Sequence, residues 1–590
     1  MKLYDTLTDM TVDKLKKRLK WLNEKDKPTR KDAIIDTIMA HLLGDRMISY
    51  WQKLDLLEQQ AIAETVHNWH GTFYSDPFYA KYNAFPDSFG SNYKGKKYWE
   101  LFLYQRMVPD ELCSALLKIA PKPHSDTIHS SQEAELVTPP ASRRFSTQDK
   151  ETTESMQCRS MEQVVKHDLH AVLRLVDSGT FSISATTGIA GAASLNKIDK
   201  LLIEGDFYSR DEDLNIENYA GGAIRPIRPY AWPLLLQTGG FAKINGNKLA
   251  LTAAGKKALN QPLEKSVHTL YQRWRDKSSV DELRRVNLIK GQSAKGQVLK
   301  NSAERKQLLE SALRACPAGE WVSINELYRY MRSCQLFHFE LCHYPWKLYL
   351  CDPQYGSLEC ETALVRDRYL LVCLFEYIAT LGLIDVAYTT PYFARGGYHS
   401  LWGIDEIHFL SRYDGLAYIR LNNLGAYVLD VSDVYHTPKV KSQPLFHVDQ
   451  KLQIHLLRQA NPSEAQNLQL YSKAKPDNNW LLDANILLQE HLSDAAIEEF
   501  QHFLSALNDD TLPAEVDKFF TDIKHRRTAL RDAGSARLIH CADKKLASMI
   551  ATNSALEKHC LLVNGNTLVV PEKSLAAFRK GAIKLGFLMQ

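Results

Sequence analysis

The chain has 590 residues, of which 45% are hydrophobic and 24% charged. This composition is that of a soluble globular protein with about four domains, and it excludes a disordered or collagen-like chain. A net charge of only +4 excludes a protein that binds DNA through overall charge, so any such contact has to come from local basic patches.

Cysteine usage and hydropathy predict a cytoplasmic protein that does not enter a membrane. The ten cysteines contain no C-x-x-C pair, and in a long chain this is typical of reduced thiols. The first residues, MKLYDTLTDM, have no apolar segment of the kind found in signal peptides. The most apolar run, residues 369–386, is interrupted by Glu376, Gly382 and Asp385, which favours a core helix and strand over a membrane span.

Residues 1–45 are predicted to form a small two-helix module. Its apolar residues recur at helical spacing on either side of a Lys-Pro-Thr turn: Val12, Leu15, Leu19, Ile34, Ile35, Ile38 and Leu42. Nine basic and three acidic residues lie between residues 10 and 31. The candidate DNA contacts here are Lys14, Lys16, Lys17, Arg18, Lys20, Arg30 and Lys31. This density suits phosphate neutralisation, and the alternative is a solvated helix face.

Two segments follow before the central part of the chain. Residues 46–120 are predicted to be a helical, winged-helix-like domain, in which Lys94, Lys96 and Lys97 form a solvated loop or a phosphate-facing patch. Residues 121–155 are rich in Ser, Thr, Pro and charge. Because such a composition buries little apolar surface, we expect a flexible linker there.

Residues 156–300 are predicted to be a winged-helix domain. An amphipathic helix near Leu169, a short strand at Phe181, a second helix over 191–202 and a hairpin around Asn245-Gly246 follow one another. The candidate recognition helix presents Ser194, Asn196, Lys197 and Lys200, and the wing carries Lys243 and Lys248. Winged helices also serve as protein-docking modules, so this alternative stays open.

The second half of the chain is predicted to contain another winged-helix-like domain followed by a domain of a different kind. Residues 301–440 are predicted to be a second winged-helix-like domain, in which Ser323 and Glu326 form a capping box. Residues 441–590 are predicted to be an α+β domain with a basic helix patch of Lys524, Arg526 and Arg527. The expected fold class is therefore mainly α with α+β parts: a helical hairpin, tandem winged helices and a C-terminal α+β domain.

The motifs that carry chemistry are missing or incomplete. Gly90–Lys97 resembles a phosphate-binding loop but ends in Lys where Ser or Thr is needed. The acidic candidates are isolated, and Asp414 before Gly415 is typical of a turn: they are Glu100, Asp385, Asp414 and Asp543. The stretch from Cys334 to Cys360 is rich in Cys and His but lacks the paired spacing of zinc ligands. We therefore expect no enzyme activity, no cofactor and no metal site.

Two resemblances are carried by particular residues. Residues 10–43 resemble a SAP motif, a DNA-binding helix-extended-helix module, on Val12, Leu15, Leu19, Pro28-Thr29 and Lys31, with Arg30 in place of the usual turn glycine. From about residue 161 the chain is similar to bacterial helicase-associated proteins whose C-terminal region resembles the N-terminal domain of XPB-type helicases. The carrying runs are LRLVDSGTFSISATTGIAG, GDFY, LTAAGKKAL, LGLIDVAY, LSRYDGLAYIRLNNLGAY, RLIHCADKKLASMIA and LVVPEKSLAAFRKGAIKLGF. The helicase motor is absent.

These observations lead to one leading hypothesis and two alternatives. The leading one is a non-catalytic accessory protein that holds double-stranded DNA and positions a separately encoded helicase or nuclease; the resemblance implies DNA repair or defence against foreign DNA. The first alternative is a sequence-specific transcription regulator. The second is a cryptic metal-dependent nuclease.

Overall fold

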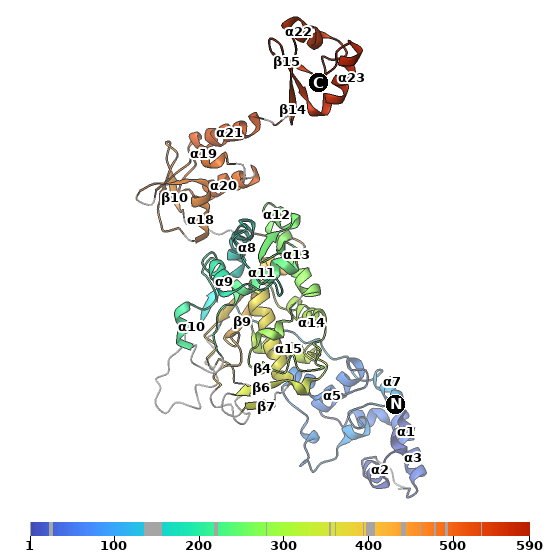
Figure 1. Cartoon of the computed structure of the whole chain (residues 1–590). Helices are drawn as coiled ribbons and strands as arrows, with labels where there is room; N and C mark the ends of the chain where they lie inside the picture. Colours follow the sequence, from blue (N-terminus) through green and yellow to red (C-terminus); the bar gives the residue numbers. More distant parts are fainter. Residues whose placement is uncertain are drawn as a thin grey trace. The chain divides into compact units, whose positions relative to one another are not determined.

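The computed structural model describes residues 2–22, 28–134, 156–216, 222–278, 280–352, 356–359, 362–392, 394–396, 407–437, 444–460, 462–476, 479–489, 492, 494–530, 532 and 534–589. The chain divides into two compact units, a large one of Met1–Lys441 with Ala460–Gln466 and a small one of Ser442–Gln459 with Asn467–Gln590. About 47% of the described residues are helical and 12% are in strands. The predicted fold class, mainly α with α+β parts and several domains, is confirmed (Figure 1).

The N-terminal helices of the large unit form one module. Its elements are α1 (Leu3–Thr8), α2 (Val12–Leu19), α3 (Lys31–Leu43), α4 (Met47–Trp51), α5 (Leu56–His67), α6 (Ser75–Tyr82), η1 (Asp87–Phe89), η2 (Tyr98–Leu101) and α7 (Asp110–Leu116). Leu15 of α2 and Ile35 of α3 are buried in the same hydrophobic cluster as Trp51, Phe102 and Leu112. The two-helix hairpin and residues 46–120 therefore share a core.

The start of the expected linker is ordered against the rest of the large unit. Ile128 is buried, and Ser131 exchanges two backbone hydrogen bonds with Trp321 at 2.9 and 2.7 Å. The Asp126 carboxylate accepts a hydrogen bond of 2.7 Å from Arg329. The expectation of flexibility is therefore wrong for residues 121–134, because backbone pairing and an ion pair hold a segment that has little apolar surface. Residues 135–155 lie outside the described residues.

Residues 161–251 have the helix and strand order of a winged helix, with α10 inserted before the third helix. The elements are α8 (Met161–Asp177), α9 (Ala192–Asp199), α10 (Arg210–Ile216), α11 (Arg228–Thr238), β2 (Ala242–Asn245) and β3 (Lys248–Leu251). The first strand is reduced to Ser182, which bridges to Lys248. The predicted hairpin is confirmed; because Asn245 pairs with Lys248, its two-residue loop begins at Gly246, whose φ is +61°.

A second winged-helix order runs from α14 to β9. Its elements are α14 (Ser302–Arg314), β5 (Trp321–Ser323), α15 (Ile324–Ser333), α16 (Thr362–Leu371) continuing into the π-helix η5 (Val372–Ile378), β8 (Ile384–Tyr388) and β9 (Leu416–Leu421). With β1 (Gln157–Arg159) they form a sheet of order β1-β8-β9-β5. The Ser323 side chain accepts from the backbone N–H of Glu326 at 3.1 Å, which is one half of the predicted capping box. The Glu326 carboxylate accepts instead from His129 N and Arg329 Nε, each at 2.8 Å.

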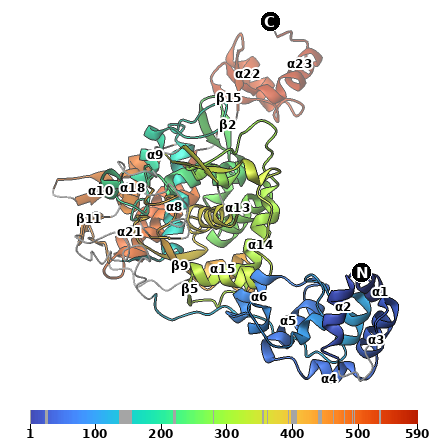
Figure 2. The same cartoon turned by 90° about the horizontal axis from the view of Figure 1, so that it is seen from below.

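Further short elements complete the large unit. They are α12 (Ala253–Ala258), α13 (Leu263–Lys277), η3 (Glu282–Arg285), β4 (Ile289–Lys290), η4 (Pro345–Lys347), β6 (Tyr349–Asp352), β7 (Gly356–Glu359) and α17 (Asn423–Val428). β4, β6 and β7 form a separate antiparallel sheet. Helix α6 of the N-terminal module packs against α15 (Figure 2), so the module is attached at the same helix that holds Asp126.

The third helices of the two winged-helix units lie together inside the large unit. α11 packs against η5 and α13, and Trp232 and Leu235 of α11 share a hydrophobic cluster with Phe375 of η5. At this junction the fully buried Glu376 accepts hydrogen bonds from Arg285 Nε at 3.0 Å and Nη2 at 2.8 Å. Arg285 Nη2 also donates to the carbonyl of Pro226, just before α11, at 2.7 Å. The ion pair between Arg285 and Glu376 therefore links the two winged-helix units within the large unit.

The small unit contains two antiparallel sheets with helices. The first sheet has the order β10-β11-β13-β12. Its elements are β10 (Phe446–Val448), β11 (Gln453–Leu456), α18 (Pro462–Tyr471), β12 (Lys473–Ala474), β13 (Asn479–Leu481), α19 (Ala484–Leu487), α20 (Asp494–Leu507) and α21 (Ala514–Ala529). The second has the order β14-β16-β15. Its elements are β14 (Ala536–His540), α22 (Lys544–Thr552), β15 (Leu561–Asn564), β16 (Thr567–Pro571), η6 (Glu572–Ser574) and α23 (Leu575–Lys584).

Replacing Glu376 tests the buried ion pair. Because E376Q leaves the Arg285 guanidinium without its counter-charge, we expect the free energy of unfolding to fall by about 3–5 kcal/mol, the usual cost of breaking a buried pair from one side. Urea denaturation followed by tryptophan fluorescence measures this. The control D430N removes a contact between the exposed side chains of Arg314 and Asp430 and should cost under about 1 kcal/mol. Equal losses in both variants would contradict the assignment.

The attachment of the N-terminal module is tested at Arg329. This side chain also donates to the carbonyls of Ala80 at 3.0 Å and Thr127 at 2.8 Å. R329A should therefore accelerate amide hydrogen exchange in residues 121–134 and in α6 by about tenfold or more, while α11 is unaffected. The control R332A, on the same helix, removes a contact of 3.5 Å to Asp367 and the packing of the guanidinium 4.6 Å from the centre of the Phe337 ring, and neither partner lies in residues 121–134. If R332A loosens residues 121–134 as much as R329A does, Arg329 has no special role.

The same contact should depend on pH in one direction. Burial opposes ionisation of Asp126, but hydrogen bonds from Arg329 and Ser333 outweigh it and lower the pKa of this carboxyl group. The stabilisation is then complete above the ordinary aspartate pKa of about 3.9 and is lost as the pH falls through the lowered value. Exchange in residues 121–134, corrected for intrinsic rates, should be constant from neutral pH to about pH 4 and rise only below it. A rise already at pH 6 would contradict this.

Candidate nucleic-acid interface

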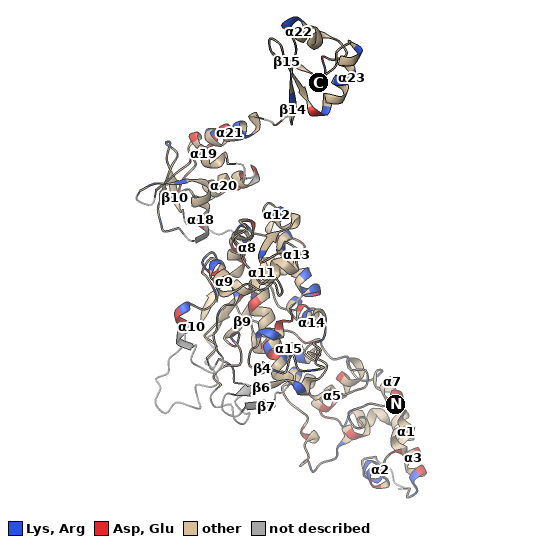
Figure 3. Cartoon of the chain, in the orientation of Figure 1, with Lys and Arg blue, Asp and Glu red and all other residues tan. Residues whose placement is uncertain are grey.

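Helix α2 presents a row of lysines on one side and packs its apolar residues on the other. Leu15 and Leu19 are buried, one turn apart. The remaining positions place Lys14, Lys16 and Lys17 in solvent, and Lys20 is exposed at the end of the helix (Figure 3). The predicted basic face of this helix therefore has the exposure that a phosphate contact requires.

Arg18 is the exception on this helix. Its side chain is 9% exposed, its Nε donates to the carbonyl of Glu100 at 3.1 Å, and its guanidinium lies 5.1 Å from the centre of the Tyr104 ring. The prediction that Arg18 contacts DNA is wrong, because the side chain is used to fix α2 against η2.

The turn after α2 is partly described. Arg30 is exposed at the start of α3, whereas Lys31 is half-buried and donates to the carbonyl of Thr8 at 2.6 Å. Residues 23–27, with Lys25 and Lys27, lie outside the described part of the chain. Of the two predicted DNA contacts, Arg30 is exposed to solvent, whereas the Lys31 ammonium group is hydrogen-bonded to a backbone carbonyl.

The 3-10 helix η2 brings further lysines beside α2. Lys17 Nζ lies 3.8 Å from Glu100 Oε1, and Lys53 and Lys96 lie 5.2 and 5.9 Å from the ring centre of Tyr98. We call the exposed lysines of α2 and its C-terminal end, together with the two beside Tyr98, the η2 surface: Lys14, Lys16, Lys17, Lys20, Lys53 and Lys96. Sequence reasoning left Lys53 out, since no pattern near it signals that the chain folds back to Tyr98.

The first winged-helix unit does not present its third helix. In this fold the third helix is the one that usually enters the DNA groove, and here it is α11, whose residues Ala231–Leu236 are all buried. The sequence placed recognition on residues 191–202, which form α9, the second helix. That assignment is wrong, because the insertion of α10 separates the true third helix from it. Ser194 of α9 is also buried, contrary to expectation.

A smaller basic group remains on this unit. Asn196, Lys197 and Lys200 on α9 and Lys243 and Lys248 on the hairpin are exposed. Lys197 Nζ donates to the carbonyl of Thr180 at 3.1 Å, and nearby Ser182 bridges to Lys248. These five residues are called the wing surface.

The basic patch predicted on α21 is matched by acids of the small unit. Lys524 lies 2.9 Å from Glu498, Arg526 lies 2.8 Å from Asp522, and Arg527 lies 2.7 Å from Asp494. Arg527 also donates to the carbonyl of Leu487 at 3.0 Å. Each positive charge therefore has a neighbouring carboxylate, two of them distant in sequence and one, Asp522, four residues before Arg526. These pairs reduce the net positive charge of the patch, and the DNA contact predicted there stays a prediction.

The acidic residues that the sequence singled out maintain the fold. Asp414 is 1% exposed and accepts from Ser411 Oγ at 2.8 Å and from Leu410 N at 2.9 Å. Asp385 pairs with Arg420 at 2.7 Å, and Asp543 caps α22 through the N–H of Leu546 at 2.8 Å. Among the residues whose side chains are described, no group of three or more His, Cys, Asp or Glu is placed to hold a metal ion.

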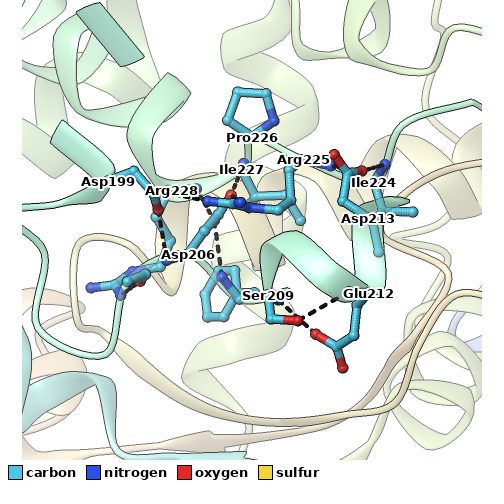
Figure 4. A network of polar contacts seen from close by, with 12 residues as sticks. Asp199, Asp206, Ser209, Glu212, Asp213, Ile224, Arg225, Pro226, Ile227 and Arg228 are labelled. Carbon is cyan, nitrogen blue, oxygen red and sulfur yellow. Dashed lines mark hydrogen bonds and ion pairs between the residues drawn. The ribbon is translucent and has the colours of Figure 1, made fainter. Parts of the chain in front are cut away.

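A polar hollow of about 500 Å³ lies at the start of α11 and is lined by charged groups of both signs. Asp206 accepts from the N–H groups of Ile227 and Arg228, each at 2.9 Å, and Arg225 pairs with Asp199 (Figure 4). Asp213 accepts from Ile224 N at 2.7 Å. Asp206 of the hollow and the neighbouring Asp213 thus hold the backbone that leads into α11.

Comparisons with models of protein families and with curated proteins found no match for this chain. Within the described ranges, no helix is both long enough and apolar enough to span a bilayer.

Removing Arg18 should affect the module, not a ligand. The substitution R18A deletes the hydrogen bond to Glu100, and losing a bond to a charged group costs roughly 1.5–3 kcal/mol. We expect faster amide exchange throughout α2 and a lower melting temperature. K14A on the exposed side of the same helix should change neither. Normal exchange in R18A would contradict the structural role.

Proposed function

We propose that this protein is a non-catalytic DNA-binding accessory factor that acts in the cytoplasm. It holds double-stranded DNA mainly through phosphates and positions a separately encoded helicase or nuclease. The resemblance to helicase-associated proteins supports DNA repair, or defence against foreign DNA, as its setting.

The η2 surface carries this proposal. Six lysines from α2, the segment after α4 and the loop before η2 are exposed, and three of them, Lys17, Lys53 and Lys96, lie beside residues of η2. Glu100, which lies 3.8 Å from Lys17, is only 17% exposed and also faces the buried Arg18, and Asp13 is exposed on α2 next to Lys14. The six lysines outnumber these two carboxylates, so the surface keeps a positive charge. Such a surface gains binding energy from the release of counterions.

The burial of both third helices favours this function over a sequence-specific regulator. Base readout in the major groove needs a helix that can enter the groove, and α11 and η5 are buried against each other. The wing surface offers four lysines and one asparagine from α9 and the hairpin. Lysine contacts to phosphates position a protein on DNA without reading its sequence.

The roles of the isolated acids support an accessory rather than a catalytic factor. Asp385, Asp414 and Asp543 each bind an arginine or cap local backbone. Their oxygens are therefore engaged by groups that stabilise the fold. This is the reason for preferring the accessory factor over the metal-dependent nuclease.

Charge reversal at the η2 surface tests the proposal. Because each lost phosphate contact removes about 0.9 from the slope of log affinity against log salt, K17E/K53E/K96E should weaken duplex binding by at least tenfold and lower the slope by about 2–3. Fluorescence anisotropy with a labelled duplex over a range of salt measures both.

The matched control is K524E/R526E, which reverses charges that already have acidic neighbours. It should leave the affinity within about twofold. The proposal fails if the triple variant binds normally, if the wild-type slope is near zero, or if selection on random duplexes yields a strong consensus sequence.

A further inference from the structure

The second sheet of the small unit has an incomplete connectivity. Its elements follow the order β14, α22, β15, β16, α23, with the spatial order β14-β16-β15. This is the split β-α-β arrangement without its last strand, which in the complete fold pairs with the first strand. Among the described residues no strand occupies that position beside β14.

The backbone of β14 identifies which groups face the vacant edge. Glu572 N donates to Ser535 O at 2.9 Å, and Cys541 N donates to Asn566 O at 2.8 Å. Because successive residues of a strand direct their backbone groups to opposite sides, the odd-numbered residues of this strand face β16. The N–H and C=O groups of Ala536, Leu538 and His540 therefore point to the open edge.

The side chains at this edge are unusually apolar for a solvent-exposed strand. Leu538 of β14 is 66% exposed and pairs with Val569 of β16. Val569 pairs in turn with Leu561 of β15, which is 67% exposed. Leu568 and Val570, on the opposite side, are buried with Phe578 of α23. The helices thus cover one side of the sheet and leave this apolar row exposed.

The two edges of the sheet differ in their regularity. β14 pairs with β16 over five residues without a shift in register, whereas the pairing of β15 is interrupted between Leu562 and Asn564. Register irregularities of this kind discourage the addition of a further strand. β14 is therefore the edge that accepts one.

The charge of this part of the chain selects the partner. Residues 535–589 contain eight basic and three acidic side chains, and Figure 3 shows basic positions on α22 and α23. Two copies paired through β14 would bring two such positive groups together. A strand that carries acidic residues gains instead from the same charges.

We propose that β14 is a docking site for an extended acidic segment of a partner protein. The proposal rests on the open edge of β14, on the exposed apolar row beside it and on the excess of basic residues in this part of the chain. The segment adds to β14 as a fourth strand, alternating β-branched apolar residues with Asp or Glu. This deepens the accessory role proposed above by naming the surface that holds the partner. It relies on no DNA contact.

The test uses the full chain and a displayed library of random ten-residue peptides. Selection should enrich peptides that alternate Val, Ile or Thr with Asp or Glu. The best peptide, made synthetically, should slow amide exchange in residues 536–540. L538E should reduce its affinity at least tenfold, because the added carboxylate repels the peptide at the edge where it binds.

Leu561 provides the matched control, since it has the same exposure and lies on the same side of the sheet. L561E changes the net charge equally and should leave peptide affinity within about twofold. Equal losses would indicate docking on the sheet face, and a dimer in light scattering that L538E dissociates would identify a second copy as the occupant. Either result, or failure to enrich such peptides, overturns the proposal. Normal peptide binding by K17E/K53E/K96E separates this test from that of DNA binding.

Discussion

The burial of Glu376 determines how the large unit is built. A carboxylate with no exposed surface is tolerated only when a cation and further donors compensate its desolvation. Arg285 supplies two hydrogen bonds and simultaneously holds the carbonyl of Pro226. The ion pair therefore fixes η5, the third helix of one winged-helix unit, beside the entry to α11, the third helix of the other. Because separating Glu376 from Arg285 would leave a buried charge unpaired, the two winged-helix units share one core.

This arrangement changes what the winged helices can do. A third helix whose apolar residues are buried in a shared core gains stability and loses access to a DNA groove. The exposed basic groups then lie elsewhere: on α9 and the hairpin, and on the N-terminal module, which α15 contacts through Arg329 and the carbonyl of Ala80. Binding through such surfaces depends on lysine contacts to phosphates, so affinity decreases with salt and carries little sequence information.

Sequence patterns predicted the structure of short segments well, but they did not predict side-chain contacts between residues that are distant in sequence. The lysine face of α2, the hairpin at Gly246 and the N-cap of Ser323 each follow from residues within a few positions of one another. The burial of Arg18 depends on Glu100, and the order of residues 121–134 depends on Arg329. Likewise, the α21 patch looked basic because Asp494 and Glu498 are distant in sequence. A count of charges identifies candidate surfaces, but only the fold shows which of them are neutralised.

The two proposed interfaces rest on different physics, and this difference makes them separable. The η2 surface attracts a polyanion through exposed ammonium groups, whose contribution is screened by salt. Strand addition at β14 rests on backbone hydrogen bonds and on the apolar row of Leu538 and Val569, which salt screens little, with a smaller contribution from opposite charges, which salt does screen. An increase in ionic strength should therefore weaken DNA binding more than it weakens the binding of a partner strand. Under the proposed function, such a factor would release DNA more readily than it releases its protein partner.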